Sequence, residues 1–142
     1  MRPILYFCCA FALLGVSGCA DSESAENATT VAEPERPSFH EIAKQHVDSK
    51  LEKPGEHSDI FMEETGTSGG THIMIVDGKV TVDGEASDWR VIVGFDNDLI
   101  YAWKVNGESK IETQDAADVK YLKVAIDKPK SKYARPLSDF GN

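Results

Sequence analysis

WRVIVGFDNDLIYAWKV, residues 89–105, carries the clearest strand pattern of the chain and predicts its class of fold. Its first half alternates two sets of side chains, with Trp89 and Phe95 in one set and Arg90 in the other. Its second half alternates in the same way from Leu99 to Val105. Period-two alternation predicts β-strands, because successive side chains of a strand point to opposite faces of the sheet. The polar run 96–98 predicts a turn, so we expect two neighbouring antiparallel strands.

Short β-rich segments flank this pair on both sides. His72–Val76 and Lys79–Val82 are predicted strands, and Asp77-Gly78 between them is typical of a two-residue hairpin. Asp83-Gly84 and Asn106-Gly107 predict the turns on either side of residues 89–105. Further strands are expected at Ser109–Glu112 and Val119–Asp127. Turns this short imply antiparallel pairing, so the sequence predicts a meander of five or six strands.

An amphipathic helix is predicted over residues 38–53, in front of the strands. Ser38 and Glu41 fit the capping-box pattern at its start, and Pro54-Gly55 ends it. Its apolar face, at helical spacing, consists of Phe39, Ile42, Ala43, Val47 and Leu51. That face is the natural partner for the aromatic face of the sheet, which is expected to bury Trp89, Phe95, Tyr101 and Trp103. The predicted fold class is therefore α+β, one helix packed on an antiparallel meander.

A small β-sandwich is the alternative fold. The opposite face of the sheet could also be apolar, through Ile92, Ile100, Leu122 and Val124. A sheet that is apolar on both faces has to be covered on both, and a second sheet is one way to cover it.

The N-terminal residues predict where the protein is located. Ile4–Val16 is almost unbroken apolar sequence behind Arg2, and it is shorter than the roughly 20 residues of a membrane span. Val16-Ser17-Gly18-Cys19 follows it. The segment resembles the signal peptide of bacterial lipoproteins, whose lipobox ends in the lipid-bearing cysteine. The alternatives are an ordinary secretory signal and an N-terminal transmembrane anchor.

The lipoprotein resemblance has direct implications. Residues 1–18 would be removed, and Cys19 would carry the lipid, including palmitate, that attaches the protein to a membrane. Ala20 follows the cysteine, where lipoproteins retained in the inner membrane of enteric bacteria usually carry Asp, so the outer membrane is favoured. The other cysteines, Cys8 and Cys9, lie in the removed segment, which leaves no thiol for a disulfide or a metal site.

Composition divides the chain into four segments. These are the signal peptide (1–18), a lipidated cysteine with a disordered acidic tether (19–37), a globular α+β domain (38–127) and an extended C-terminal tail (128–142). The chain has 15 Lys and Arg against 24 Asp and Glu, a net charge of −9. Such an acidic protein is a poor candidate for nucleic acid or for electrostatic binding to anionic lipid. Membrane attachment is therefore expected to come from the lipid at Cys19.

Two further resemblances concern the domain. Residues 78–85, Gly-Lys-Val-Thr-Val-Asp-Gly-Glu, with Val91, Val93 and Phe95 after them and Lys132-Tyr133 near the end, are similar to carboxypeptidase-regulatory-like domains. Those are small β-sandwiches, mostly without catalytic residues, and the likeness implies a structural or binding module. The order of helix, irregular segment and meander is similar to small exported bacterial domains of unknown function. This second likeness implies a fold and no site residues.

Candidate chemistry is sparse. The 142 residues contain no G-x-S-x-G, H-E-x-x-H, P-loop or G-x-G-x-x-G pattern. His57 and His72 lie in or beside expected irregular chain and could form a two-histidine site with Asp59 or Glu63. Oxygen-bearing side chains at Asp96, Asn97 and Asp98 could hold Ca²⁺, although turns also favour these residue types. A basic cluster in the tail could contact anionic envelope groups or simply be solvated: Lys128, Lys130, Lys132 and Arg135.

These observations favour a lipid-anchored bacterial envelope protein, a non-catalytic binding or structural module in the periplasm or at the cell surface. No catalytic residue, cofactor or nucleic acid is assigned. The expected partners are the membrane, through Cys19, and a protein or cell-wall component. The alternative is a small periplasmic hydrolase or metal-dependent enzyme that uses His57 or His72 with a nearby carboxylate.

Overall fold

The computed structural model describes residues 37–140. Cys19, the signal peptide and the acidic tether lie outside the described residues, apart from Pro37. In chain order the described residues form α1 (Phe39–Asp48), β1 (Glu56–Gly66), β2 (His72–Val82), β3 (Glu85–Gly94), β4 (Ile100–Val105), β5 (Glu108–Ile111), α2 (Ala116–Asp127), β6 (Arg135–Pro136) and the 3₁₀ helix η1 (Leu137–Phe140). The α+β class expected from the sequence is confirmed.

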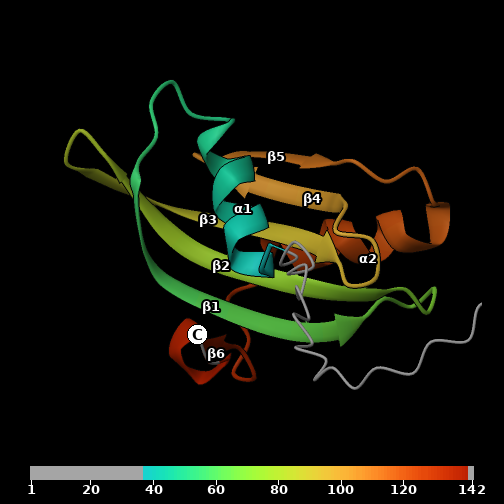
Figure 1. Ribbon diagram of the computed structural model, residues 1–142. Helices are drawn as coiled ribbons and strands as arrows, with labels where there is room; N and C mark the ends of the chain where they lie inside the picture. Colours follow the sequence, from blue (N-terminus) through green and yellow to red (C-terminus); the bar gives the residue numbers. More distant parts are fainter. Residues whose placement is uncertain (1–36, 141–142) are drawn as a thin grey trace, which may run out of the picture. The chain divides into compact units, whose positions relative to one another are not determined.

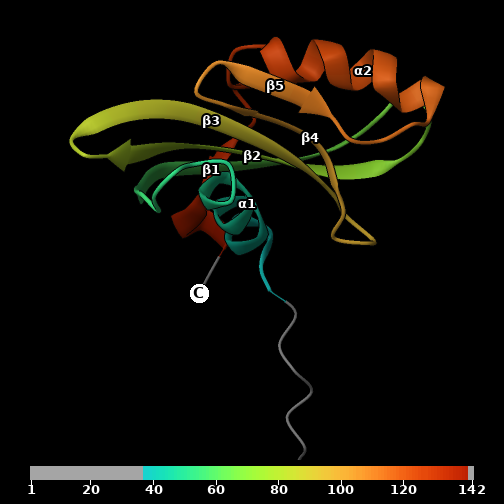
Figure 2. The ribbon, with the colours of Figure 1, turned by 90° about the horizontal axis from the view of Figure 1, so that it is seen from above.

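The strands form one six-stranded antiparallel sheet in the order β5-β4-β3-β2-β1-β6 (Figure 1). β1 to β5 make a meander in which each strand pairs with the next. The chain then passes through α2 and returns to the far edge of the sheet, where β6 pairs with β1. The two helices lie on opposite faces of the sheet (Figure 2). The second face is thus covered by a helix, and a second sheet, the sandwich alternative, is not present among residues 37–140.

α1 begins where the capping pattern places it. The Glu41 carboxylate accepts hydrogen bonds at 3.1 Å from the backbone N–H and from the hydroxyl of Ser38. The hydrogen bond from the Ser38 backbone is the main cause that lowers the pKa of Glu41. The helix ends at Asp48, and residues 49–53, expected to be helical, form a turn and a bend.

The core under α1 joins the helix to one face of the sheet. Ala43 and Val47 of the helix are fully buried there, together with Trp89 and Trp103. Phe95 packs against this core as expected, whereas Tyr101 packs on the other face. The expectation for Tyr101 is wrong because the pairing of β3 with β4 shifts register between Ile92 and Val93, which changes the face of the residues beyond the shift.

The predicted strand Val119–Asp127 is wrong, because this segment belongs to α2. Asp115 caps the helix by accepting a 2.9 Å hydrogen bond from the Ala117 N–H. The apolar residues recur at helical spacing, and Leu122, Ala125 and Ile126 are buried on one side. Val124 is 52% exposed. α2 therefore covers Ile73, Ile75, Ile92 and Ala102 on the second face of the sheet.

The hairpin predicted at Asp77-Gly78 is also wrong. β2 continues through both residues and pairs with β1 on one side and β3 on the other. The predicted turns at Asp83-Gly84 and Asn106-Gly107 are confirmed, and in each the two residues have φ between 50° and 87°. Positive φ at both central positions is the conformation of a type I′ hairpin turn.

Residues 128–140, expected as an extended tail, contain β6 and η1. β6 pairs Arg135 with Met62 and Pro136 with Phe61. Leu137 and Phe140 of η1 pack against the core under α1. The C-terminal segment is therefore part of the folded domain as far as Phe140.

Candidate functional site

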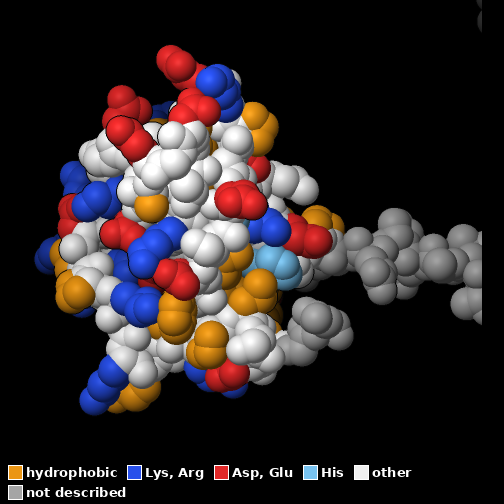
Figure 3. Space-filling model, turned by 90° about the vertical axis from the view of Figure 1, so that its left-hand side faces the viewer, with side chains coloured by type: hydrophobic (Ala, Val, Ile, Leu, Met, Phe, Trp, Pro, Cys, Tyr) orange, Lys and Arg blue, Asp and Glu red, His pale blue; other side chains and the backbone are white. Residues whose placement is uncertain are grey.

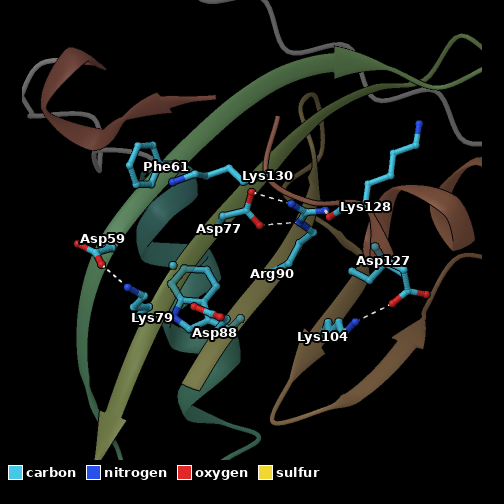
Figure 4. Close-up of a pocket in the computed structure, with 13 residues that line it drawn as sticks. Asp59, Phe61, Asp77, Lys79, Asp88, Arg90, Lys104, Asp127, Lys128 and Lys130 are labelled. Carbon is cyan, nitrogen blue, oxygen red and sulfur yellow. Dashed lines mark hydrogen bonds and ion pairs between the residues drawn. The ribbon is translucent and has the colours of Figure 1, made fainter. Parts of the chain in front are cut away.

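A pocket of about 620 Å³ lies on the α2 face of the sheet, beside the C-terminal end of that helix (Figure 4). Four strands, the end of α2 and the segment after α2 line it. The lining residues are Asp59, Phe61, Asp77, Gly78, Lys79, Asp88, Trp89, Arg90, Lys104, Ile126, Asp127, Lys128 and Lys130. Small-molecule sites commonly have volumes of roughly 300–1,000 Å³, so the pocket is large enough for a ligand of several heavy atoms.

Arg90 forms the base of the pocket and is fixed by its neighbours. Its Nε donates to Asp77 Oδ1 at 2.5 Å and its NH2 donates to Asp77 Oδ2 at 2.9 Å. Its NH1 donates to the carbonyl oxygens of Ala125 and Lys128, each at 2.6 Å. Arg90 is only 8% exposed. The guanidinium therefore joins β2 to the end of α2, and its role is to hold the pocket wall in place.

Asp59 enters the pocket because the backbone of β1 is irregular. The pairing of β1 with β2 shifts register between Ser58 and Phe61, and Asp59 has a φ of 51°. Its carboxylate accepts a 2.8 Å hydrogen bond from Lys79 Nζ. This hydrogen bond is the main cause that lowers the pKa of Asp59 and raises the pKa of Lys79, so both groups are charged at neutral pH.

Lys130 lies beside β1, and its charge contributes to lowering the pKa of Asp59. Its Nζ is 3.2 Å from the centroid of the Phe61 ring, a cation–π contact. Lys104 Nζ lies 2.7 Å from Asp127 Oδ1, and this ion pair closes the side near α2. The side chain of Lys128 extends away from these residues (Figure 4).

Asp88 differs from the other carboxylates of the pocket. Asp59, Asp77 and Asp127 each form an ion pair with a basic side chain of the pocket. Among the described residues, no basic nitrogen lies within ion-pair distance of Asp88. Likewise, no carboxylate there pairs with Lys130. Lys128 also lines the pocket without an ion pair, but its side chain extends away from the other lining residues (Figure 4). Asp88 and Lys130 are therefore the two oppositely charged lining residues that form no ion pair within the pocket.

The histidines do not come together. His57 pairs with Val80 near one end of the β1–β2 ladder, and His72 pairs with Gly66 at the other end. At about 3.4 Å per residue the two positions are on the order of 30 Å apart. Both also lie in strands, not in irregular chain. A single site built from both histidines is therefore wrong.

Each histidine has its own local partner. His57 Nε2 lies 2.9 Å from Asp48 Oδ1, the His57 side chain is only 8% exposed, and its ring meets Trp89 edge-on with centroids 5.6 Å apart. His72 Nε2 lies 2.8 Å from Glu64 Oε1, and its ring stacks on Phe95 at 4.3 Å. Asp59, one of the expected carboxylate partners, pairs with Lys79 instead.

Asp96 and Asn97 lie in the turn between β3 and β4, and Asp98 follows it. Asn97 Oδ1 accepts from the Leu99 N–H at 3.1 Å, and Asn97 Nδ2 donates to the Tyr101 hydroxyl at 3.0 Å. Both the oxygen and the nitrogen of the Asn97 amide are therefore used in hydrogen bonds to residues within four positions of it. Across residues 37–140, no three His, Cys, Asp or Glu side chains are grouped so that they could hold a metal ion. We therefore propose no calcium site at these residues.

The predicted basic cluster is divided in the structure. Lys128 and Lys130 line the pocket, whereas Lys132 lies over the Tyr133 ring and Arg135 lies over the Phe140 ring. Acidic and basic side chains are intermixed on the face of the molecule shown in Figure 3. Cys19 lies outside the described residues, and no helix among residues 37–140 is long and apolar enough to cross a membrane.

The sequence patterns do not predict most of the pocket. They place Asp77 in a turn and Arg90 in one of the two alternating sets of residues 89–95, and they single out no role for Lys104. One signal was available, because these charged residues continue the strand positions occupied by the buried Ile75, Ile92 and Ala102. Charged side chains in line with a buried apolar face predict either ion pairs or a site.

Comparison with known proteins adds no assignment. The chain matches no protein-family model, no curated protein and no solved structure. Its function is therefore inferred from its residues and their geometry.

Proposed function

We propose that this chain is a lipid-anchored bacterial envelope protein whose folded domain is a non-catalytic binding module. The envelope location is supported by the lipobox pattern that ends at Cys19. The binding role is supported by one observation in particular, the pocket of about 620 Å³ with two side chains of opposite charge that the protein does not pair. Charged groups held at a concave surface are a common basis of specific recognition.

Binding accounts for the pocket better than catalysis does. The base of the pocket is a fully engaged ion pair, because Asp77 and the carbonyl oxygens at the end of α2 occupy the Arg90 guanidinium. No histidine lines the pocket. The groups that remain available, Lys130 and Asp88, are suited to hold a ligand through charge.

Lipid labelling tests the anchor. In bacteria supplied with radioactive palmitate, the chain should be labelled, and Cys19→Ser should abolish both the label and the cleavage of the signal peptide. Cys9→Ser is the matched control and should remain labelled, because Cys9 lies within the segment that would be removed. Label that survives in Cys19→Ser would contradict the anchor. Fractionation of the labelled chain then tests the outer-membrane location, which recovery in the inner membrane would contradict.

The binding role is tested with envelope extracts. The wild-type chain and Lys130→Glu are immobilised separately, and the retained protein and cell-wall components are compared. We expect at least one component to be retained by the wild type and lost from the variant, since the substitution reverses a charge at the pocket wall. Identical retention by both chains would contradict a role for this pocket.

A further inference from the structure

We propose that the pocket binds a small zwitterion, specifically a di- or tripeptide with a free ammonium and a free carboxylate. The inference rests on the proposed binding function and names the ligand class. Lys130 would receive the carboxylate and Asp88 the ammonium, while the apolar part of the ligand would lie near Phe61 and Ile126.

The charge inventory of the pocket supports this class. Three of its carboxylates and three of its cations are already paired with each other: Asp59 with Lys79, Asp77 with Arg90, and Asp127 with Lys104. Within the described part of the chain, Lys128, Lys130 and Asp88 have no such partner, and the side chain of Lys128 extends away from the other two (Figure 4). A ligand that carried only a negative or only a positive charge would pair with one of these two side chains and would leave the other unpaired or repel it. A zwitterion neutralises both.

The separation of the two groups sets the length of the ligand. Lys130 Nζ lies on the ring of Phe61 in β1, and Asp88 lies in β3, which is two strands away. Phe61 is level with Arg90 through Asp77, and Asp88 lies two residues farther along β3. With adjacent strands about 4.8 Å apart and about 3.4 Å per residue along a strand, the two positions are roughly 12 Å apart. An extended peptide spans up to about 3.5 Å per residue, so two or three residues fit between the charged groups.

The side chains around the two groups are held in place. Lys79 stands across from Asp88 in the β2–β3 ladder and is tied to Asp59 at 2.8 Å, which keeps it from collapsing onto Asp88. Lys79 still lies close enough for the charge of Asp88 to favour its protonated form and raise its pKa. Phe61 is anchored by the pairing of β1 with β2 and β6. Strand pairing therefore fixes the backbone of Asp88 and of Phe61, while the side chains of Asp88 and Lys130 are exposed and open to a ligand.

Three matched peptides test the ligand class by calorimetric titration of the purified chain of residues 1–142 in mild detergent. The probes are alanyl-alanine, N-acetyl-alanyl-alanine, which lacks the ammonium, and alanyl-alanine amide, which lacks the carboxylate. We expect alanyl-alanine to bind at least about tenfold more tightly than either blocked form, because each loses one charge pair. Equal affinity for the three, or no binding at about 10 mM, would overturn the inference.

Two variants connect each charge of the ligand to its residue. Asp88→Asn should weaken alanyl-alanine about tenfold and leave the acetylated peptide unchanged, since that peptide has no ammonium to lose. Lys130→Gln should weaken alanyl-alanine similarly and leave the amide unchanged. Asp96→Asn and Lys123→Gln, exposed residues outside the pocket, are the controls. Circular dichroism checks that every variant is folded.

The outcomes separate the ligand class from the proposed function. If the acetylated peptide binds as tightly as alanyl-alanine and Lys130→Gln abolishes both, the pocket is an anion site. The zwitterion is then wrong while the binding role stands. If Asp88→Asn and Lys130→Gln change nothing, the assigned groups are wrong. The labelling and capture experiments do not depend on either result.

Discussion

Arg90 and Asp77 form a two-point ion pair across the β2–β3 ladder, where the two residues are also register partners. The same guanidinium donates to two carbonyl oxygens at the end of α2. Asp77 and Arg90 continue the strand positions of the buried Ile75 and Ile92, and their opposite charges form an ion pair there. The pair links the sheet, α2 and the pocket.

Asp77→Asn should lower the free energy of unfolding by about 3–5 kcal/mol, because it leaves a mostly buried guanidinium without its counter-charge. Arg90→Lys should be destabilising as well, since an ammonium cannot make the same set of fixed hydrogen bonds. Urea unfolding measures both. The control is Lys104→Gln, whose ion pair with Asp127 is exposed and should contribute less than about 1 kcal/mol. A loss of similar size in all three variants would contradict the special role of Arg90.

Leu122→Ala and Val124→Ala test the helical assignment of α2. In a strand, residues two apart share a face, so both substitutions would have similar effects. In α2, Leu122 is fully buried and Val124 is 52% exposed. Leu122→Ala should therefore cost about 2–5 kcal/mol, and Val124→Ala should change stability by about 0.5 kcal/mol or less. Equal losses in thermal or urea unfolding would favour the strand.

Gly78→Ala should destabilise the fold by about 1–3 kcal/mol through overpacking. A Cβ at Gly78 would lie 2.7 Å from Trp89 Cε2 and closer still to its Cζ2, so the indole would have to move. A shift in tryptophan fluorescence should accompany the loss of stability. Gly66→Ala is the control, because a Cβ there would meet only the Thr71 carbonyl, at 3.8 Å. A fluorescence spectrum unchanged from the wild type would contradict the close contact.

Stability should fall between pH 7.5 and pH 5.5, in part through His46. Burial, with the charge of Lys50, lowers the pKa of His46, and the charge of Glu112 partly opposes this. The folded state then binds fewer protons than the unfolded state, so stability is lost as the pH falls below about 6.5 and is unaffected well above it. His40 acts in the same direction, because burial also lowers its pKa.

The measurement is urea unfolding of the wild type and of His46→Gln at both pH values. In His46→Gln the free energy of unfolding should differ less between pH 7.5 and pH 5.5 than it does in the wild type. The remaining difference comes in part from His40, which the variant retains. Carboxylates whose pKa values are lowered in the folded state change the stability only below about pH 4.5, which is outside the range from pH 7.5 to pH 5.5. A pH dependence in His46→Gln equal to that of the wild type would contradict the role of His46.

The amino-acid sequence predicts the features that depend on a few neighbouring residues. The alternation over residues 89–105 predicts β3 and β4, because side-chain direction in a strand is a local property. Asp83-Gly84 and Asn106-Gly107 predict their turns, since both require positive φ. Ser38 and Glu41 mark the start of α1 through contacts made within the first turn.

The course of β2, the helical state of residues 119–127 and the pocket follow from tertiary contacts, because they depend on partners distant in the chain. Asp77-Gly78 can form a turn, but pairing with both β1 and β3 keeps β2 extended through it. Residues 119–127 are compatible with a strand, but the second apolar face of the sheet is covered when they form a helix that buries Leu122. Lys130 reaches the pocket only because the chain after α2 crosses to β1, where it meets Phe61. Local pattern therefore predicts β3, β4, two turns and the start of α1, whereas long-range burial and pairing decide α2, the course of β2 and the pocket.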